Sequence, residues 1–298
     1  MIRGAREGGA GAHGGSVTIE RVLIIGAGGM LGRAWCGLLR AHGIPFEPLG
    51  REGLDLEDLA AVGALRLSGY SHVINCAAWT AVDDAEAAEA RAHTVNGAAV
   101  GTLARRCAES GARFVTYSTD YVFDGLASRP YPADAPHRPV NAYGRSKAAG
   151  EALLRQVDGP WLCVRTSWVY APWGRNFVRT IAGAARPVLR VVHDQRGRPT
   201  SAEGLARTSL GLVLRGASGI WHATDGGECT WFELAREIVR LAGAPCAVEP
   251  CTSAEFPRPA PRPAYSVLDI GETERAVGPM IPWQSAVADV VRRLRAGA

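Results

Sequence analysis

The sequence predicts an α/β protein built on a Rossmann-like, doubly wound parallel sheet, with a smaller C-terminal substrate region interleaved with it. Two observations support this fold class. Short apolar runs alternate with helical patterns from about residue 21 to residue 170, which is the spacing of βαβ units. A glycine-rich turn, residues 26–32, follows the first run and opens a helical pattern. The 298 residues suffice for one large α/β domain or two modest ones.

Five strands and four helices are expected in the first part of the chain. The strands span residues 22–25, 44–49, 72–76, 113–118 and 161–167. The helices run from the glycine turn to about His42, over 55–67 with Asp55 as the N-cap, over 93–110 and over 141–156. Ligands bind at the carboxyl ends of the strands in such sheets, so four strand-end segments are the first candidates for function. These segments are 26–32, 75–80, 118–120 and 166–168.

Composition divides the chain into three parts. Residues 1–20 begin with a Gly/Ala-rich stretch that lacks the apolar segment of a secretory signal, and we expect a disordered leader there. Residues 21–170 form the predicted dinucleotide-binding domain. Prolines become frequent in residues 171–298, which we expect to be a substrate-binding region. Within this region, 188–192 and 219–223 are expected to be strands that return to the sheet.

Bulk composition argues against several classes of function. The net charge of +4 is spread along the chain without a block of Lys or Arg, so a nucleic acid partner is not expected. No apolar run approaches the roughly 20 residues that span a bilayer. The seven cysteines include no CxxC pair, which fits a reducing cytoplasm and argues against zinc and disulfides. We therefore expect a cytoplasmic protein without a metal, either a monomer or a homodimer.

The glycine turn has the spacing GxxGxxG through Gly26, Gly29 and Gly32. Glycines after a strand let the backbone approach a pyrophosphate, which binds at the N-terminus of the next helix. The alternative is a tight turn without a ligand. Arg51 follows the second strand and favours the 2′-phosphate of NADPH, with NADH left open and a solvated loop charge as the alternative. Glu47, at a suitable distance for a ribose ligand, is expected to lie within the strand.

Tyr143 and Lys147 are the predicted catalytic pair. Positions four apart lie on one face of a helix, so the phenol and the ammonium project together. A nearby cation should lower the tyrosine pKa from its usual value of about 10 toward neutral, which suits a proton donor in ketone reduction. Lys147 is the only lysine among 33 basic residues, which indicates a site where arginine cannot replace it. The alternative is a surface helix pair.

Three further polar residues are candidates. Ser118 and Thr119 end the fourth strand, and either hydroxyl can hydrogen-bond a substrate oxygen. Strand-end capping is the alternative. Asn96, early in a helix, either holds a water in a proton relay or is a packing amide.

Together these motifs resemble the extended short-chain dehydrogenase/reductases, and within them the dTDP-4-dehydrorhamnose reductase family. The resemblance runs from about Arg21 to the C-terminus, with matching segments 75–83, 118–125, 165–171, 194–200, 262–266 and 268–269. It implies that NAD(P)H reduces the C4 ketone of a dTDP-4-keto-6-deoxy sugar, and that Thr119, Tyr143 and Lys147 are catalytic. The implied cofactor-binding residues are Gly26, Gly29, Met30, Leu31, Arg51, Asp55, Ala77, Ala78 and Lys147. The implied substrate-binding residues are Thr80, Val82, Tyr121, Trp168, Asn176 and Arg262.

The chain departs from the family pattern at Trp79 and in the unusually basic loop with Arg196 and Arg198, so the sugar can differ from the rhamnose precursor. Acidic residues linked to a metal in some members are not identifiable here, and no metal is predicted. One alternative is a 4-ketoreductase for another secondary-metabolite deoxysugar. A second is a non-catalytic regulatory subunit, such as that of methionine adenosyltransferase. A third is a sugar-nucleotide epimerase or dehydratase.

Overall fold

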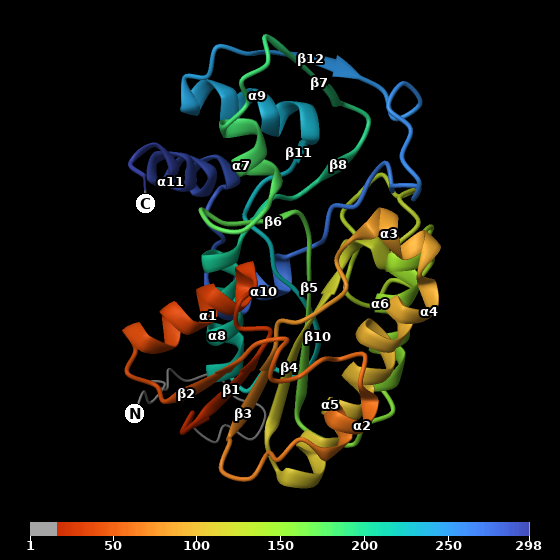
Figure 1. Ribbon diagram of the computed structural model, residues 1–298, viewed down its shortest axis with the longest axis vertical. Coiled ribbons are helices and arrows are strands. Elements are labelled where there is room, and N and C mark those ends of the chain that lie inside the picture. The colour runs from red at the N-terminus through yellow and green to blue at the C-terminus, as the bar shows by residue number, and fades with distance from the viewer. Residues whose placement is uncertain (1–16, 298) are drawn as a thin grey trace.

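The computed structural model describes residues 17–297 and is built around one six-stranded parallel sheet (Figure 1). The strand order is β10-β5-β4-β3-β1-β2. The strands are β1 (Val22–Ile25), β2 (Phe46–Leu49), β3 (His72–Asn75), β4 (Arg113–Thr119), β5 (Trp161–Thr166) and β10 (Gly219–His222). The order reverses between β1 and β3, the position at which doubly wound sheets bind ligands. The predicted fold class is confirmed.

Helices cover both faces of the sheet because alternate residues of each strand point to opposite sides. In β1, Val22 and Ile24 belong to one apolar cluster, whereas Leu23 and Ile25 belong to another. The first cluster includes side chains of α1 (Met30–Ala41) and α8 (Ala202–Leu214). The second includes side chains of α2 (Leu59–Ala64), α5 (Ala99–Ser110) and α6 (Ala142–Leu154). Figure 1 shows these two sets of helices on opposite sides of the sheet.

Helix α2 is shorter than predicted. It begins after Asp58, whose carboxylate accepts a hydrogen bond from the backbone nitrogen of Ala61 at 2.9 Å. The prediction of Asp55 as the N-cap is therefore wrong. Asp55 instead accepts a hydrogen bond from the backbone nitrogen of Glu57 at 3.0 Å, in the turn before the helix.

The helix expected from residue 93 begins earlier. It starts as α4 (Glu89–His93), passes through the π-helical turn η1 (Thr94–Ala98) and continues as α5 to Ser110. Of the five residues of α4 only Ala92 is buried, so no apolar stripe marks this start in the sequence.

The C-terminal part adds a second layer beside the carboxyl ends of the strands (Figure 1). Strand β10 joins β5 in the sheet, as predicted. The prediction that residues 188–192 return to this sheet is wrong, because β7 (Val188–Val192) pairs with β12 (Ala247–Cys251) in a separate two-stranded sheet. Of the residues of β7 only Val191 is buried, whereas β1, β3, β4 and β5 of the main sheet are buried along almost their whole length. Val191 packs in an apolar cluster with α7 (Phe177–Ala182), α9 (Trp231–Ala242) and α11 (Trp283–Arg295).

Short elements connect the two layers. They are α3 (Val82–Ala87), η2 (Asp120–Val122), β6 (Val169–Tyr170), β8 (Arg196–Gly197), β9 (Thr200–Ser201), β11 (Cys229–Thr230) and α10 (Gly271–Val277). Strand β6 pairs with β9, and β8 pairs with β11. In this way residues 165–171 and 194–200, which are far apart in the sequence, meet at the edge of the sheet.

Of the expected leader, residues 1–16 lie outside the described residues. Ile19 is buried in the apolar cluster that contains β1, so packed structure begins before the predicted boundary at residue 21. Within residues 17–297, no helix has the length and apolar character needed to cross a membrane.

Candidate active site

The glycine loop between β1 and α1 packs so closely on neighbouring backbone that a side chain is excluded at Gly26 and Gly32. Gly26 has a φ of 77°, and a Cβ there would lie 2.6 Å from the backbone nitrogen of Ala77. A Cβ on Gly32 would collide with the carbonyl oxygen of Gly26. Gly29 is the N-cap of α1 and has no side chain to cap the first N–H groups of that helix. A dinucleotide therefore fits this loop, since helix N-termini bind anions.

The other predicted residues of the loop surround it. Met30 and Leu31 form the first turn of α1. Ala77 and Ala78 follow β3, the strand next to β1, and the backbone nitrogen of Ala77 donates to the Asn75 side chain at 3.1 Å. The structure thus brings these residues together where the strand order reverses.

Arg51 and Asp55 lie beyond the carboxyl end of β2. The Arg51 side chain is 74% exposed, and its Nη2 lies 3.3 Å from an oxygen of Asp55 and 3.3 Å from one of Glu57. A 2′-phosphate would compete with both carboxylates for this guanidinium. Glu47 lies within β2, as expected, and pairs with Arg21 at 3.0 Å.

Helix α6 carries Tyr143 and Lys147 one turn apart. Asn141 is its N-cap and accepts a hydrogen bond from the backbone nitrogen of Gly144 at 2.7 Å. Lys147 is buried, and its Nζ donates to the carbonyl oxygen of Tyr117 in β4 at 2.6 Å. Burial lowers the pKa of Lys147 to about 8, because an apolar environment disfavours the ammonium.

The Tyr143 phenol is not acidified in this structure. Burial raises the pKa of Tyr143 to about 12, a hydrogen bond with the Thr119 hydroxyl opposes this, and the Asp120 carboxylate adds to it. The prediction that Lys147 brings the pKa of Tyr143 toward neutral is therefore wrong for the free protein. The physical reason is that the Lys147 ammonium is directed to the Tyr117 carbonyl, while burial dominates at the phenol.

Thr119, rather than Ser118, faces the tyrosine. The Thr119 hydroxyl donates to Asp120 Oδ1 at 2.9 Å and accepts from the backbone nitrogen of Tyr121 at 3.2 Å. Ser118 instead donates to Glu151 Oε1 at 2.5 Å, inside the protein. Burial raises the pKa of Asp120 to about 7. Of the two candidate hydroxyls, only that of Thr119 lies close enough to the Tyr143 phenol to lower its pKa.

Asn96 and Trp79 have structural contacts. The Asn96 side chain accepts from the backbone nitrogen of Trp79 at 2.9 Å and donates to its carbonyl at 3.0 Å. It also donates to the Ser146 hydroxyl at 2.9 Å. The Trp79 indole donates to the carbonyl of Ala81 at 3.1 Å, and the Arg91 guanidinium lies over its ring at 5.3 Å. These contacts fit a packing amide that braces the loop after β3.

Tyr121 and Arg262 continue from the phenol toward the C-terminal region. The rings of Tyr121 and Tyr143 meet edge to face at 5.9 Å. Burial raises the pKa of Tyr121, and the nearby Arg262 guanidinium opposes that increase. Arg262 Nη1 donates to Asp83 Oδ1 at 2.5 Å. Although burial opposes it, hydrogen bonds from Arg262 and Arg258 hold the pKa of Asp83 at about 2. The same loop and helix carry the exposed Thr80 and the half-buried Val82.

Asn176 and Trp168 lie in the segment after β5. Asn176 is the N-cap of α7, where its side chain accepts from the backbone nitrogen of Arg179 at 3.1 Å and donates to the carbonyl of Ala171 at 2.8 Å. Its amide is therefore engaged by the backbone. Trp168 is half-buried, and its ring stacks on Trp231 with the centroids 3.7 Å apart.

The basic loop after β7 is partly neutralised. Arg196 lies 3.6 Å from carboxylate oxygens of both Glu228 and Glu233. The carbonyl of Arg198 accepts from the Ser167 hydroxyl at 2.6 Å, and burial lowers the pKa of its guanidinium. Within residues 17–297, no group of three or more His, Cys, Asp or Glu side chains is arranged to hold a metal ion.

Comparison with known proteins identifies the family. The model of the RmlD substrate binding domain matches residues 20–296. The chain belongs to the RmlD family. It is 41% identical, over 93% of this chain and 98% of the relative, to a dTDP-4-keto-6-deoxy-D-glucose reductase of Streptomyces niveus. It is 43% identical, over 90% and 92%, to a dTDP-4-dehydrorhamnose reductase of Streptomyces griseus. A dTDP-4-dehydrorhamnose reductase of Bacillus anthracis, solved in complex with NADP, superposes with a TM-score of 0.85 at 32% identity, over 94% of this chain and all of that one.

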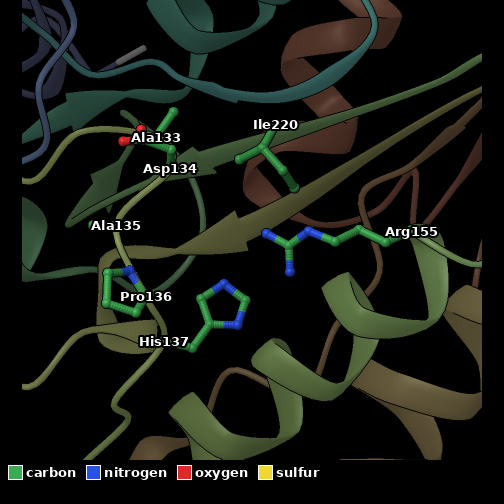
Figure 2. A pocket seen from close by; sticks show the side chains of 7 residues that line it. All are labelled: Ala133, Asp134, Ala135, Pro136, His137, Arg155 and Ile220. Carbon is green, nitrogen blue, oxygen red and sulfur yellow. The ribbon is translucent and has the colours of Figure 1, made fainter.

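A pocket of about 590 Å³ in this RmlD-family chain has none of the predicted site residues in its lining, and Figure 2 shows the side chains that do line it. It is lined by Ala133, Asp134, Ala135, Pro136, His137, Arg155 and Ile220.

His137 also belongs to a buried polar cluster, in which Glu151 pairs with Arg165 at 2.7 Å. The sequence analysis did not identify this pair. Glu151 lies in α6 and Arg165 in β5, so no local spacing in the sequence indicates this pair.

Proposed function

We propose that the chain reduces the C4 ketone of a dTDP-4-keto-6-deoxy sugar, with NADPH as the cofactor and NADH as the alternative. One observation carries the proposal. Helix α6 brings Tyr143 and Lys147 to β4, where Lys147 Nζ donates to the Tyr117 carbonyl at 2.6 Å and Thr119 lies close enough to the phenol to lower its pKa, in a chain whose glycine loop fits a dinucleotide. The family membership and the names of the two Streptomyces relatives support the substrate class.

Each catalytic side chain has a separate task. NADPH supplies the hydride when it is bound. Tyr143 is protonated at neutral pH and donates its proton to the nascent alkoxide oxygen, which is a stronger base than a phenolate. In the free protein the Lys147 ammonium is held by the Tyr117 carbonyl, and in the proposed mechanism it acts on the phenolate only once cofactor and substrate are bound. Thr119 hydrogen-bonds the oxygen on which charge develops. Positioning of these groups on α6 and β4 holds the ketone oxygen between two hydroxyls.

The cofactor residues are assigned to the glycine loop and its surroundings: Gly26, Gly29, Met30, Leu31, Arg51, Asp55, Ala77, Ala78 and Lys147. The substrate residues are assigned to the opposite side of the phenol: Thr80, Val82, Tyr121, Trp168, Asn176 and Arg262. Arg262 supplies a positive charge for the diphosphate, and Asp83 holds it in place. In this assignment residues 21–170 bind the cofactor and residues 171–298 cover the sugar nucleotide. We also propose a cytoplasmic monomer or homodimer.

Steady-state turnover tests the proposal. Purified protein is assayed with dTDP-4-keto-6-deoxyglucose and with dTDP-4-dehydrorhamnose, each with NADPH and NADH, by the loss of cofactor absorbance. We expect activity with at least one sugar and no activity without the dTDP moiety. Tyr143→Phe should lower kcat by at least about a hundredfold. Tyr70→Phe is the matched control, because Tyr70 bonds Glu47 at the other end of the sheet. Near-normal turnover of Tyr143→Phe would refute the proton-donor role.

The same assay separates the alternatives. NMR of the product gives the configuration at C4 and distinguishes the rhamnose precursor from another deoxysugar, since relatives of both kinds match this chain about equally. A regulatory subunit would bind the cofactor without consuming it. An epimerase or dehydratase would retain its NAD through purification and need none added.

A further inference from the structure

Trp168 has a backbone conformation that bulky side chains avoid. Its φ is 47°, and among the non-glycine residues of 17–297 it alone has a positive φ. A left-handed conformation is unfavourable for an L-residue with a large side chain. Such a conformation persists only where the surroundings hold it, and it is common at functional sites.

Two neighbours hold the Trp168 ring. The ring stacks on Trp231, with centroids 3.7 Å apart and an interplanar angle of 14°. It also lies against Gly197, where an added Cβ would meet the indole at 2.7 Å. The backbone is fixed as well, because the Trp168 carbonyl accepts from the nitrogen of Thr200 at 3.3 Å. No larger residue than glycine at 197 leaves room for the ring.

Trp231 is itself immobilised. It is the first residue of α9, directly after the N-cap Thr230. The Thr230 hydroxyl accepts from the backbone nitrogen of Glu233 at 3.2 Å, and the Glu233 carboxylate accepts from the backbone nitrogen of Thr230 at 2.7 Å. The ring of Phe177 meets Trp231 edge to face at 4.6 Å. Trp231 therefore forms a rigid support for a ring that stands at the end of β5.

We infer that Trp231 and Gly197 are positioning residues that fix the Trp168 ring for contact with the nucleotide sugar. The inference rests on the proposed function, in which Trp168 lines the sugar-nucleotide pocket. A support of this kind reduces the ordering that the ring would undergo when substrate binds. The alternative is that the three residues are ordinary packing between the sheet edge and α9.

Trp231→Leu and Trp231→Phe test the inference. Leucine keeps an apolar side chain but removes the aromatic stack, so KM for the keto-sugar should rise by about tenfold with kcat changed less than about twofold. Phenylalanine should restore most of the affinity. Trp221→Leu, which removes an indole on the edge strand β10, is the control and should leave KM unchanged. The circular dichroism of the coupled Trp168 and Trp231 indoles should be lost in Trp231→Leu and in Trp231→Phe, and should be kept in Trp221→Leu.

Gly197→Ala displaces the Trp168 ring through a different contact, because the added Cβ would meet the indole. It therefore tests the inference even if Trp231→Leu fails to fold. It should raise KM in the same direction and leave the Kd for NADPH unchanged. An unchanged KM in folded Trp231→Leu or Gly197→Ala, with the indole coupling lost, overturns the inference.

Calorimetric titration with dTDP-rhamnose separates this inference from the proposed function. If the wild-type protein shows no turnover, the proposed function fails. The ratio of the dTDP-rhamnose Kd of Trp231→Leu to that of the wild type then decides the inference alone. A ratio near ten supports it, and a ratio near one, or no binding by the wild type, overturns it.

Discussion

Removal of Arg165 should destabilise the protein through the carboxylate that it leaves behind. Arg165 and Glu151 have side-chain exposures of 0% and 1%, and the guanidinium donates to both Glu151 oxygens, at 2.9 Å and 2.7 Å. Although burial opposes it, the hydrogen bonds from Arg165 and His137 hold the pKa of Glu151 well below its usual range. Breaking a buried pair by removing one partner costs roughly 3–5 kcal/mol. We expect Arg165→Met to lower the free energy of unfolding by that amount at pH 7.

Urea denaturation followed by far-ultraviolet circular dichroism measures this loss. In Arg165→Met the pKa of Glu151 should rise above its unfolded value, so the destabilisation relative to the wild type should shrink as the pH falls and the carboxyl protonates. The double variant Arg165→Met/Glu151→Leu should recover most of the stability, since an apolar replacement of a buried pair is often neutral. A loss below about 1 kcal/mol for Arg165→Met would be typical of an exposed pair and would refute the reasoning.

Three further predictions follow from the site and its surroundings. Burial lowers the pKa of Lys147 to about 8, so kcat/KM should fall as the pH rises through that value and the ammonium is lost; Lys147→Arg should show low activity without this alkaline limb in the pH–rate profile. Burial lowers the pKa values of His72 and His222 to about 4, below the usual value of about 6.5 in the unfolded chain. Because the unfolded chain takes up these protons first, the free energy of unfolding should fall by on the order of 3 kcal/mol for each imidazole as the pH drops from 6.5 to 4. The melting temperature should drop over the same range. Gly32→Ala should weaken NADPH binding by about a hundredfold in a fluorescence titration because its Cβ would displace the glycine loop, whereas Gly28→Ala, with nothing within 4 Å of its Cβ, should bind like the wild type.

The central strands β1, β3, β4 and β5 were predictable because they are buried along almost their whole length and read as largely apolar runs. The same local pattern could not show which strands pair with one another. Residues 188–192 form a strand, as expected, but its partner is Ala247–Cys251, a segment with Pro250 and alternating exposure that shows no strand signal of its own. Strand pairing across roughly 60 residues depends on tertiary packing, which sequence patterns do not contain.

The proposal of Tyr143 and Lys147 as a pair has a different basis, since a single lysine four residues after a tyrosine is informative in a chain that otherwise uses arginine. The pKa of Tyr143 was not predictable from the sequence. Whether Lys147 acidifies Tyr143 depends on where the ammonium points, and the Tyr117 carbonyl determines that through the fold. The sequence analysis did not identify Trp231, because only its stack on Trp168 in the folded protein singles it out.

In the proposed mechanism, the hydrogen bonds of Thr119 have to change when substrate binds. A threonine hydroxyl has one proton to donate, and in the free protein it goes to Asp120 Oδ1. Donation to a substrate oxygen therefore requires the hydroxyl to turn away and leave a buried carboxylate with one donor fewer. Burial already raises the pKa of Asp120 to about 7, so this loss favours its protonated form. A neutral Asp120 in turn removes the negative charge that raises the pKa of Tyr143, and the phenol becomes a better proton donor when Thr119 engages the ketone.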